Sequence, residues 1–558
     1  MNKINYIIFI FIYVISITNG QTKLSPQSAA TAQTFGTFSD DLDAVNWNPA
    51  ILGYYNFDNP TILNIASVDS NQNYYSVQLI ANTDKKRVKE TRKTFHRKFD
   101  KNIPWTIIKM DSLYKLQVGD FRDRITAEIF RDSVLIKGYK DAWIIKDDEP
   151  LLKTEQKLKE ERFDFEFLNL GAMLSNSSAD ANWINNYILN GDDVGELDVK
   201  GKNNIISVFP DDGWRLNPII NYKFGLRIKN FALQVSPDIF GEFVIPTGLI
   251  KLVFNGNEIS EPINFSGRKN QFQAVLPLTF SYGMKTNIPI LEKYVHRSFI
   301  GINAKYLAGL AYFESASKTF TITPDSDQIS LITHIKTKYS LAGAYMEVDT
   351  SKSFNYLFIT DIDSTSLTIP AGSGYAFDLG FIMDINDKVS ASIAFTNLLG
   401  QITWGKETAY EHELKQQTEI PMEEESQDQL DSLFQTGIEI DTNIAITSFK
   451  TKYPGFLILG AEYSFDKLKL ASNLKFGFNN ELGSSTTPRF SLGAEFHPVK
   501  WFSLLGGTSI GGFEGFQWGT GFCLKLLFFQ MNIGLSEYGG IMNSAKGASL
   551  SASTSFVF

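Results

Sequence analysis

The chain has 558 residues, 13% of them aromatic, with 41 glycines and a formal net charge of -9. The acidic balance argues against a nucleic-acid-binding protein. A single cysteine, Cys523, excludes a disulfide framework and a Cys-rich metal site, and five scattered histidines show no metal-ligand spacing. The sequence therefore predicts neither a metal nor a cofactor.

The first twenty residues have the features of a secretory signal peptide. Lys3 gives a positive start, Ile7 to Ile17 is apolar, and Thr18-Asn19-Gly20 supplies small residues before Gln21. No cysteine follows the apolar run, which argues against a lipid anchor. No later apolar stretch reaches the roughly 18 to 20 residues of a membrane helix. We expect residues 1–20 to be removed on export, leaving a periplasmic protein or an outer-membrane barrel.

Residues from about 83 to 162 are predicted to form an irregular insertion. This segment contains the basic run Lys85 to Lys101 and a helix-like stretch, Leu151 to Arg162. Runs of charged residues usually form solvated loops. The more specific alternative is cation bridging to lipid A phosphates. The sequence does not determine the side of the membrane on which the insertion lies.

Alternating apolar and polar residues predict strands along most of the remaining chain. In Tyr375 to Asp384, for example, Tyr375, Phe377 and Leu379 share one face and Asp378 lies on the other. Strands of about 9 to 12 residues suit a tilted crossing of a membrane. Other segments with this alternation are Gln271 to Ser281, Phe299 to Tyr312, Lys388 to Thr396, Leu468 to Phe478 and Arg489 to Pro498.

The links between the later strands are alternately long and short, which indicates an up-and-down barrel. Short turns are periplasmic in such barrels, so the second irregular insertion, residues 406–454, is predicted to lie outside the cell. It carries Glu423-Glu424-Glu425, and Ile438 to Ile446 alternates like a strand. Successive spanning strands alternate in direction, and counting the crossings in this way assigns that stretch to a loop rather than to a spanning strand. The number of spanning strands predicted is about 14.

The last strand is the clearest of the series. From Ala548 to Phe558 the even positions are apolar or small, and the odd positions from Ser549 to Ser555 are all serine. This pattern suits lipid on one side and a polar lumen on the other. A terminal aromatic strand is what the outer-membrane barrel assembly machinery is known to read in such proteins, so we expect Phe558 to serve as that signal. The predicted location is therefore the outer membrane of a Gram-negative cell, with its lipid as a partner.

Three segments carry a family resemblance. The stretch Ser28 to Gly53 contains the predicted hatch residues Trp47, Asn48, Pro49 and Ala50. Two strand motifs follow, G-S-G-Y-A-F-D-L-G with Gly372, Gly374, Asp378 and Gly380, and A-F-T-N-L-L-G-Q-I-T-W with Asn397 and Trp404. A third strand, Gly301 to Gly309, is similar too. Together these segments resemble the long-chain fatty-acid transporter (FadL) superfamily, including its secretion-associated, PorV-like barrels and an uncharacterised branch.

The resemblance implies an all-β fold, a transmembrane antiparallel barrel of about 14 strands whose lumen is blocked by an N-terminal hatch, residues 21–60. The barrel then occupies residues 61–558 with the two insertions. In such transporters the hatch moves and an apolar ligand leaves sideways into the membrane. Ile51 departs from the family's usual glycine after Asn-Pro-Ala, and the two insertions are atypical. Proline fixes its own φ and favours an extended Asn48, which suits a defined turn.

No enzyme is predicted. Gly507-Thr508-Ser509-Ile510-Gly511 matches the G-x-S-x-G pattern of hydrolases, but lies at a strand end without the required strand-to-helix elbow. Glu495, His497 and Ser491 share one strand face, and nothing in the sequence orients them for catalysis. Lumenal charges are expected to form ion pairs around water, the candidates being Lys305, Asp378, Glu462 and Lys475.

Two functional hypotheses follow. The first is passive uptake of a hydrophobic small molecule through the hatch and lumen. The second is a non-transport scaffold, or a secretion-associated protein, that binds exported proteins through its external insertions.

Overall fold

The computed structural model describes residues 24–34, 42–54, 74–99, 103, 105–110, 113–121, 123–147, 163–189, 199–211, 213–255, 262–264, 269–289, 294–341, 344–345, 361–362, 370–405, 408–421, 437–480, 482, 484–512 and 515–558. The predicted signal peptide lies outside these residues. Among them, no helix combines the length and apolar character needed to cross a bilayer.

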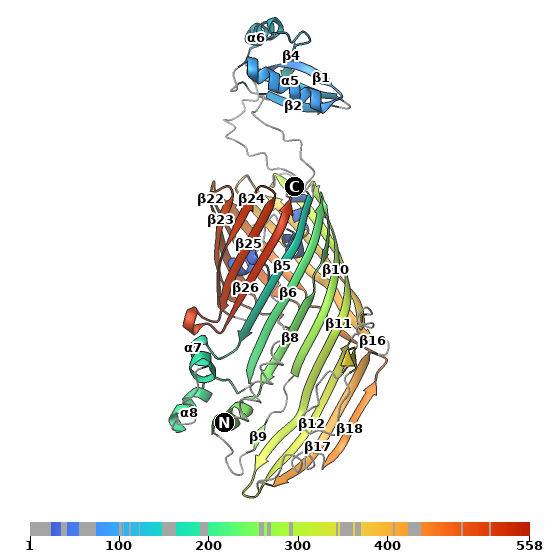
Figure 1. The fold of residues 1–558 in the computed structure, drawn as a ribbon, viewed down its shortest axis with the longest axis vertical. Helices are drawn as coiled ribbons and strands as arrows, with labels where there is room; N and C mark the ends of the chain where they lie inside the picture. Colours follow the sequence, from blue (N-terminus) through green and yellow to red (C-terminus); the bar gives the residue numbers. More distant parts are fainter. Residues whose placement is uncertain are drawn as a thin grey trace. The chain divides into compact units, whose positions relative to one another are not determined.

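Fourteen strand positions close into one antiparallel ring, which confirms the predicted fold class (Figure 1). The last strand pairs with the first, from Gly547↔Ser175 to Val557↔Asp164, so the ring has no free edge. In chain order the ring strands are β5 (Phe163–Asn176), β6 (Trp214–Ile228), β7 (Phe231–Val235) continued by β8 (Asp238–Ile245), β10 (Lys269–Thr286), β11 (Arg297–Pro324), β15 (Gly372–Asp384), β16 (Val389–Gly405), β19 (Ser448–Lys452) continued by β20 (Phe456–Ser464), β21 (Leu468–Gly477), β22 (Arg489–Val499), β23 (Phe502–Gly511), β24 (Gln517–Leu526), β25 (Phe529–Tyr538) and β26 (Gly547–Val557).

The two ends of the ring differ in their connections. At one end, which we call the short-turn end, five links are brief (229–230, 385–388, 465–467, 500–501 and 527–528) and the sixth, 287–296, is longer. Phe163 and Phe558 also meet there through paired backbone hydrogen bonds of 3.2 and 2.8 Å. The opposite, long-loop end carries α7 (Ala181–Ile184), η1 (Asn185–Leu189), α8 (Val199–Ile206), α9 (Thr247–Asn255) and η4 (Met542–Ser544).

Burial along the strands is inverted relative to a water-soluble protein. In β26 the four serines from Ser549 to Ser555 are buried, whereas Leu550 is 59% exposed. In β15, Asp378 is fully buried while Tyr375 is 64% exposed. Because exposing large apolar side chains to water is unfavourable, this pattern indicates that the outer surface faces lipid and the polar surface faces the lumen.

A sheet of four strands projects beyond the ring at the long-loop end (Figure 1). The second half of β11 pairs with β12 (Gln328–Leu341), which pairs with β17 (Ala409–Pro421), which pairs with β18 (Ile438–Ala445). The stretch that includes β18 is therefore not a spanning strand, as parity predicted. Short strands β9 (Ile263–Asn264), β13 (Ala344–Tyr345) and β14 (Asp361–Ile362) complete the loops.

Opposite charges pair across the strands of this projecting sheet. Glu413 accepts hydrogen bonds of 2.7 Å from the Lys336 ammonium and from the His334 ring. The Lys336 ammonium, followed by His334, lowers the pKa of Glu413 to about 2. The carboxylate is thus ionised at neutral pH, and its pairing is lost only as pH falls through that value.

Residues 57–162 form a compact unit of their own. Their elements follow the order β1 (Tyr74–Asn82), α5 (Lys85–Lys98), β2 (Trp105–Met110), β3 (Leu113–Phe121), α6 (Arg124–Ile136) and β4 (Trp143–Asp147). The sheet order is β2-β3-β1-β4 with antiparallel pairs throughout, which is the ferredoxin-like arrangement. Where the sequence predicted an irregular insertion from about residue 83, the described residues form regular elements, and the predicted helix-like stretch Leu151 to Arg162 lies outside the described residues.

The helices of this inserted unit begin at side-chain caps. Asp84 accepts from the Lys86 amide and Asp123 from the Thr126 amide, each at 2.8 Å. The sequence reading missed α5 because few of its residues are apolar. Among the α5 residues whose burial is described, Val88 and Phe95 alone are fully buried in the core of the unit.

We expect the lipid-facing surface to reject charge while the projecting sheet tolerates it. Replacing Leu550 by Arg places a cation in the apolar belt and should lower the free energy of unfolding by about 2 to 4 kcal/mol. Ile444→Arg in β18 is the matched control, because Ile444 is 55% exposed but lies beyond the ring. Its effect should stay within about 0.5 kcal/mol. Denaturant titration of both variants in lipid vesicles checks this, and equal losses would contradict the assignment of the two surfaces.

Candidate functional site

The N-terminal residues of the described chain lie inside the ring. Residues 24–34 contain α2 (Pro26–Ala30), and residues 42–54 contain α3 (Ala44–Trp47) and α4 (Ile51–Tyr54). We call these two stretches the lumenal segment. All but Tyr54 of its residues are buried, although its helices are only four or five residues long. Isolated helices of that length are unstable in water, so the surrounding barrel holds them in place.

Asn48 and Pro49 form the turn between α3 and α4. Asn48 is extended, with φ -153° and ψ 105°, as the following proline requires. Its side-chain oxygen accepts a hydrogen bond of 3.1 Å from the Ala50 amide, and its backbone carbonyl accepts one from Ile51. The Asn48 amide group donates to the Phe381 carbonyl of β15 at 3.3 Å. One side chain therefore both caps α4 and ties the turn to the barrel wall.

Three glycines in register line the part of the barrel wall against which this turn packs, and we call them the glycine bed. Gly283 of β10 pairs with Gly301 of β11, which pairs with Gly380 of β15. A Cβ added at Gly301 would collide with the Pro49 backbone, and one added at Gly380 would collide with the Asn48 side chain. At Gly283 it would come within 2.8 Å of the Pro49 carbonyl oxygen. Glycine at all three positions lets the backbone of the turn approach the wall closely.

Buried charges hold the same stretch from the side of β6. Lys223 forms an ion pair with Asp43, and both side chains are almost completely buried. Arg227 donates to the Leu52 carbonyl at 3.2 Å and lies 3.7 Å from Asp164 of β5. A buried cation without its partner is strongly destabilising, so these contacts fix the position of the lumenal segment as well as its presence.

Asp378 organises a polar network beside the turn. Its carboxylate accepts from the Asn303 amide group and from the Asn397 backbone amide, both at 2.6 Å, and pairs with Lys305 at 2.7 Å. Lys305 also donates to the Asn397 side chain at 2.7 Å. Asn303 in turn donates to the Val45 carbonyl at 3.0 Å, which connects the network to the lumenal segment. Asn397 adopts φ +54°, a left-handed conformation in which asparagine is favoured.

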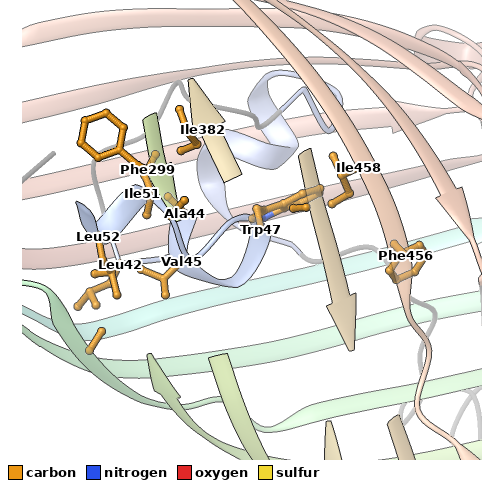
Figure 2. Packing of buried hydrophobic residues seen from close by; sticks show 13 residues of the cluster. Leu42, Ala44, Val45, Trp47, Ile51, Leu52, Phe299, Ile382, Phe456 and Ile458 are labelled. Atoms are coloured by element: carbon orange, nitrogen blue, oxygen red, sulfur yellow. The ribbon is translucent and has the colours of Figure 1, made fainter. Parts of the chain in front are cut away.

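Apolar packing against the barrel wall also holds residues 42–54 in place, as Figure 2 shows. Trp47 lies among Phe456 and Ile458 of β20, and the Lys475 ammonium is 5.2 Å from its ring centroid. Tyr54 packs edge-on against Phe299, with ring centroids 5.3 Å apart. This core joins Leu42, Ala44, Val45, Trp47, Ala50, Ile51 and Leu52 to Ala232, Phe299, Ile382, Ala394, Phe456 and Ile458.

Residues 24–34 have a second glycine bed on the opposite wall. Added Cβ atoms at Gly507, Gly519 and Gly534 would collide with the backbones of Thr31, Ala29 and Pro26. The Asn221 side chain donates to the Leu24 carbonyl at 2.7 Å, and the Ser25 hydroxyl caps α2. The lumenal segment is therefore fitted to two walls of the ring by the same device.

An aromatic cluster lies farther toward the long-loop end. Trp404 is fully buried and donates to the Thr451 hydroxyl at 2.8 Å. Gly309 and Gly372 make room for its ring, since a Cβ at either would lie 2.7 Å from it. Tyr312 and Phe449 pack on the same ring, with centroids 5.6 and 6.3 Å away. Gly374 instead faces the backbone of Gln401 in the neighbouring strand.

The structure thus separates the predicted site residues into two groups. The hatch residues Trp47 to Ala50 lie together with Asp378, Gly380 and Asn397, whereas Gly372, Gly374 and Trp404 belong to the second, aromatic group. Sequence reasoning missed Gly283, Asn303, Lys223 and Arg227 as partners of the lumenal segment. Isolated glycines within alternating strands were the available signal, because they mark close backbone approach.

The residues that match the hydrolase pattern, and the neighbouring Glu495 and His497, do not come together as a site. Gly507 and Ser509 lie within β23, where Gly507 contacts the lumenal segment and Ser509 lies beside Gln517. His497 does contact Ser503 at 3.0 Å and Glu495 at 3.4 Å, but the Ser503 residue is only 3% exposed. In the part of the chain that is described, no group of three or more His, Cys, Asp or Glu residues could hold a metal.

Filling the glycine bed should dislodge the turn without opening the ring. Gly301→Ala overpacks the contact with Pro49 and should weaken the packing of the lumenal segment against the barrel wall by about 1 to 3 kcal/mol. Gly506→Ala is the matched control, because its added Cβ would meet only the Gly519 oxygen at 3.8 Å. Hydrogen exchange of the amides in residues 44–54 should accelerate in the first variant and not in the second. Unchanged exchange in Gly301→Ala would contradict the close fit.

Comparisons with known proteins place the chain in a family. No curated protein matches the sequence. Among solved structures, the chain is similar to the toluene transporter TbuX of Ralstonia pickettii, at 11% identity over 72% of this chain and 90% of that one, with a TM-score of 0.36. It is also similar to a Pseudomonas aeruginosa FadL homologue, at 9% identity over 97% and 99% of the two chains, with a TM-score of 0.39. The strand pairing establishes the closed barrel independently of these likenesses. A model described as "family of unknown function (DUF5723)" matches residues 162–535, and the chain belongs to this family.

Proposed function

We propose that this protein is an outer-membrane channel for a hydrophobic small molecule, closed at rest by the lumenal segment. The observation that carries the proposal is the fit of residues 42–54 to the glycine bed of Gly283, Gly301 and Gly380. A segment fitted in this way lies inside the ring but contributes no strand to it. It can therefore leave its seat while the hydrogen-bonded barrel remains intact.

The chemistry of the contacts supports a movable closure. The lumenal segment is held by side-chain hydrogen bonds and two ion-paired cations, Lys223 and Arg227, rather than by a continuous ladder. Such contacts can be exchanged for water one at a time as the segment moves. Non-helical backbone at membrane depth is tolerated where it is enclosed by protein, as it is here.

The second group of site residues supports an apolar cargo. The aromatic cluster around Trp404 lies on the long-loop side of the lumenal segment, since Gly372 pairs with Trp404 eight residues before Gly380 along β15. Aromatic and aliphatic side chains with a few polar groups are the usual lining of sites for small hydrophobic ligands. In this proposal a molecule entering from outside meets this cluster before it meets the closure.

The proposal includes the location and orientation of the barrel. The apolar outer belt supports insertion in lipid, and the short turns with Phe558 are assigned to the periplasmic side. Recognition of Phe558 by the assembly machinery and removal of residues 1–20 belong to the same proposal.

Removing the closure tests the function directly. Deleting residues 24–54 should raise conductance in planar bilayers and uptake of an apolar fluorescent probe into vesicles, while heat-dependent migration in SDS persists. Pro49→Gly is a milder variant that frees φ at the turn, at about 1 kcal/mol, and should raise the open fraction several-fold.

Replacing residues 410–445 by a Gly-Gly link provides the control. It removes β18 and all of β17 except Ala409, which is already hydrogen-bonded to Ile446, and it leaves the lumenal segment untouched. Conductance should then equal that of the unaltered protein. If deleting residues 24–54 yields a folded barrel with no added conductance, the scaffold hypothesis replaces the channel.

A further inference from the structure

The inserted unit of residues 57–162 has an unusual helix surface. On α6, Ala127 and Val134 are buried, and the opposite side of the helix carries Ile125, Ile129 and Ile136. These three isoleucines are 71%, 66% and 87% exposed. Helical spacing of four and seven residues places them on one stripe, interrupted by Asp132, which pairs with Arg131 at 2.7 Å. A stripe of exposed isoleucines on the outer side of a helix indicates an interaction surface.

The neighbouring helix is strongly basic. The sequence of α5, KKRVKETRKTFHRK, has eight Lys and Arg residues and a single acidic residue, Glu90. Val88 and Phe95 point into the core, and helical spacing places Lys86, Lys93 and Arg97 on the opposite, solvent-exposed side.

The two helices present these features on the same side of the sheet. Val88 and Phe95 of α5 and Val134 of α6 pack in one cluster with Val77 and Val118. Because both helices cover the same sheet face, their outer sides form one surface, which we call the helical face. It combines exposed isoleucines with an excess of cations.

Connectivity fixes the end of the barrel from which the inserted unit extends. Before the insertion, Tyr54 packs on Phe299, two residues from the start of β11 at the short-turn end. After it, Phe163 begins β5 beside Phe558 at the same end. The insertion therefore leaves and returns at the short-turn end of the barrel. In the proposed orientation this end is periplasmic, so lipid A in the outer leaflet is not a partner for its cations.

We propose that the helical face of the inserted unit docks on the anionic phospholipid surface of the periplasmic leaflet. This inference rests on the proposed location of the barrel in the outer membrane. Aliphatic side chains flanked by Lys and Arg are the composition of segments that lie in a lipid interface. The basic side of α5 is complementary to anionic headgroups, and its long side chains can reach them while the isoleucines enter the acyl boundary. The covalent connection to the barrel keeps the unit close to that leaflet, which favours weak binding.

Shielding of Ile129 by lipid tests the proposal in the full-length protein. Ile129→Cys is labelled with an environment-sensitive fluorophore in a Cys523→Ser background and placed in lipid nanodiscs. In discs containing phosphatidylglycerol the emission should shift to the blue and an aqueous quencher should lose access. Discs of phosphatidylcholine alone, or high salt, should reverse both changes.

Two controls define the surface. A label at Trp143→Cys should stay accessible, because Trp143 pairs with Gln78 on the sheet face opposite the helices and is 58% exposed. The triple variant Lys86→Glu, Lys93→Glu, Arg97→Glu should reduce the shielded fraction of the Ile129 label on the order of tenfold or more. Charge reversal at two lysines outside both helices, Lys140→Glu and Lys146→Glu, should have a much smaller effect on the shielded fraction of the Ile129 label.

Several outcomes would overturn the proposal. The first is that the Ile129 label stays exposed in phosphatidylglycerol discs. The second is that the label remains shielded in the triple variant. Shielding in native membranes but not in these discs would indicate a protein partner instead. Labelling of Ile129→Cys by an impermeant maleimide on intact cells would place the unit outside. Conductance of the residue 24–54 deletion is independent of α5 and α6, so failure of the channel proposal and failure of this one are distinguishable.

Discussion

Closure of the hydrogen-bonded ring between β26 and β5 is the constraint on which the other features depend. A segment that crosses lipid must satisfy its own backbone groups, and an antiparallel sheet does so only when its edges meet. Once the ring closes, alternate residues of every strand face lipid or lumen. The serines of β26 are then enclosed and Leu550 is exposed. The polar lumen created in this way allows a separate stretch of chain to occupy it.

The lumenal segment is adapted to that interior in its backbone as well as its side chains. Two glycine beds let short helices and the Asn48-Pro49 turn approach the wall, and Lys223, Arg227 and Asn303 satisfy its polar groups. Because none of these contacts belongs to the strand ladder, we expect the ring to close without them. Stability of the barrel and seating of the segment are therefore separable, which a closure requires and a structural core does not.

Much of the barrel could be predicted from sequence because strand alternation is local. The serine stripe of β26, the short turns and the parity that excluded β18 as a crossing can all be read within a few residues. The glycine bed could not, because Gly283, Gly301 and Gly380 meet only through the register of three strands. Asp378 and Asn397 were identified as motif residues, but their link to Lys305 spans three strands. The ferredoxin-like unit was missed because α5 has many charges and little apolar periodicity.

The central claim is that the lumenal segment must leave its seat for a molecule to pass. A disulfide between Leu42→Cys and Gly225→Cys, in a Cys523→Ser background, tests this directly, because a Cβ added at Gly225 of β6 would lie 3.4 Å from the end of the Leu42 side chain and no closer than 3.1 Å to any other group. Uptake of an apolar probe into vesicles is measured in the oxidised and reduced states of the same protein. We predict that oxidation abolishes uptake and that reduction restores it. Equal uptake in both states, with the disulfide shown to have formed, would contradict the account.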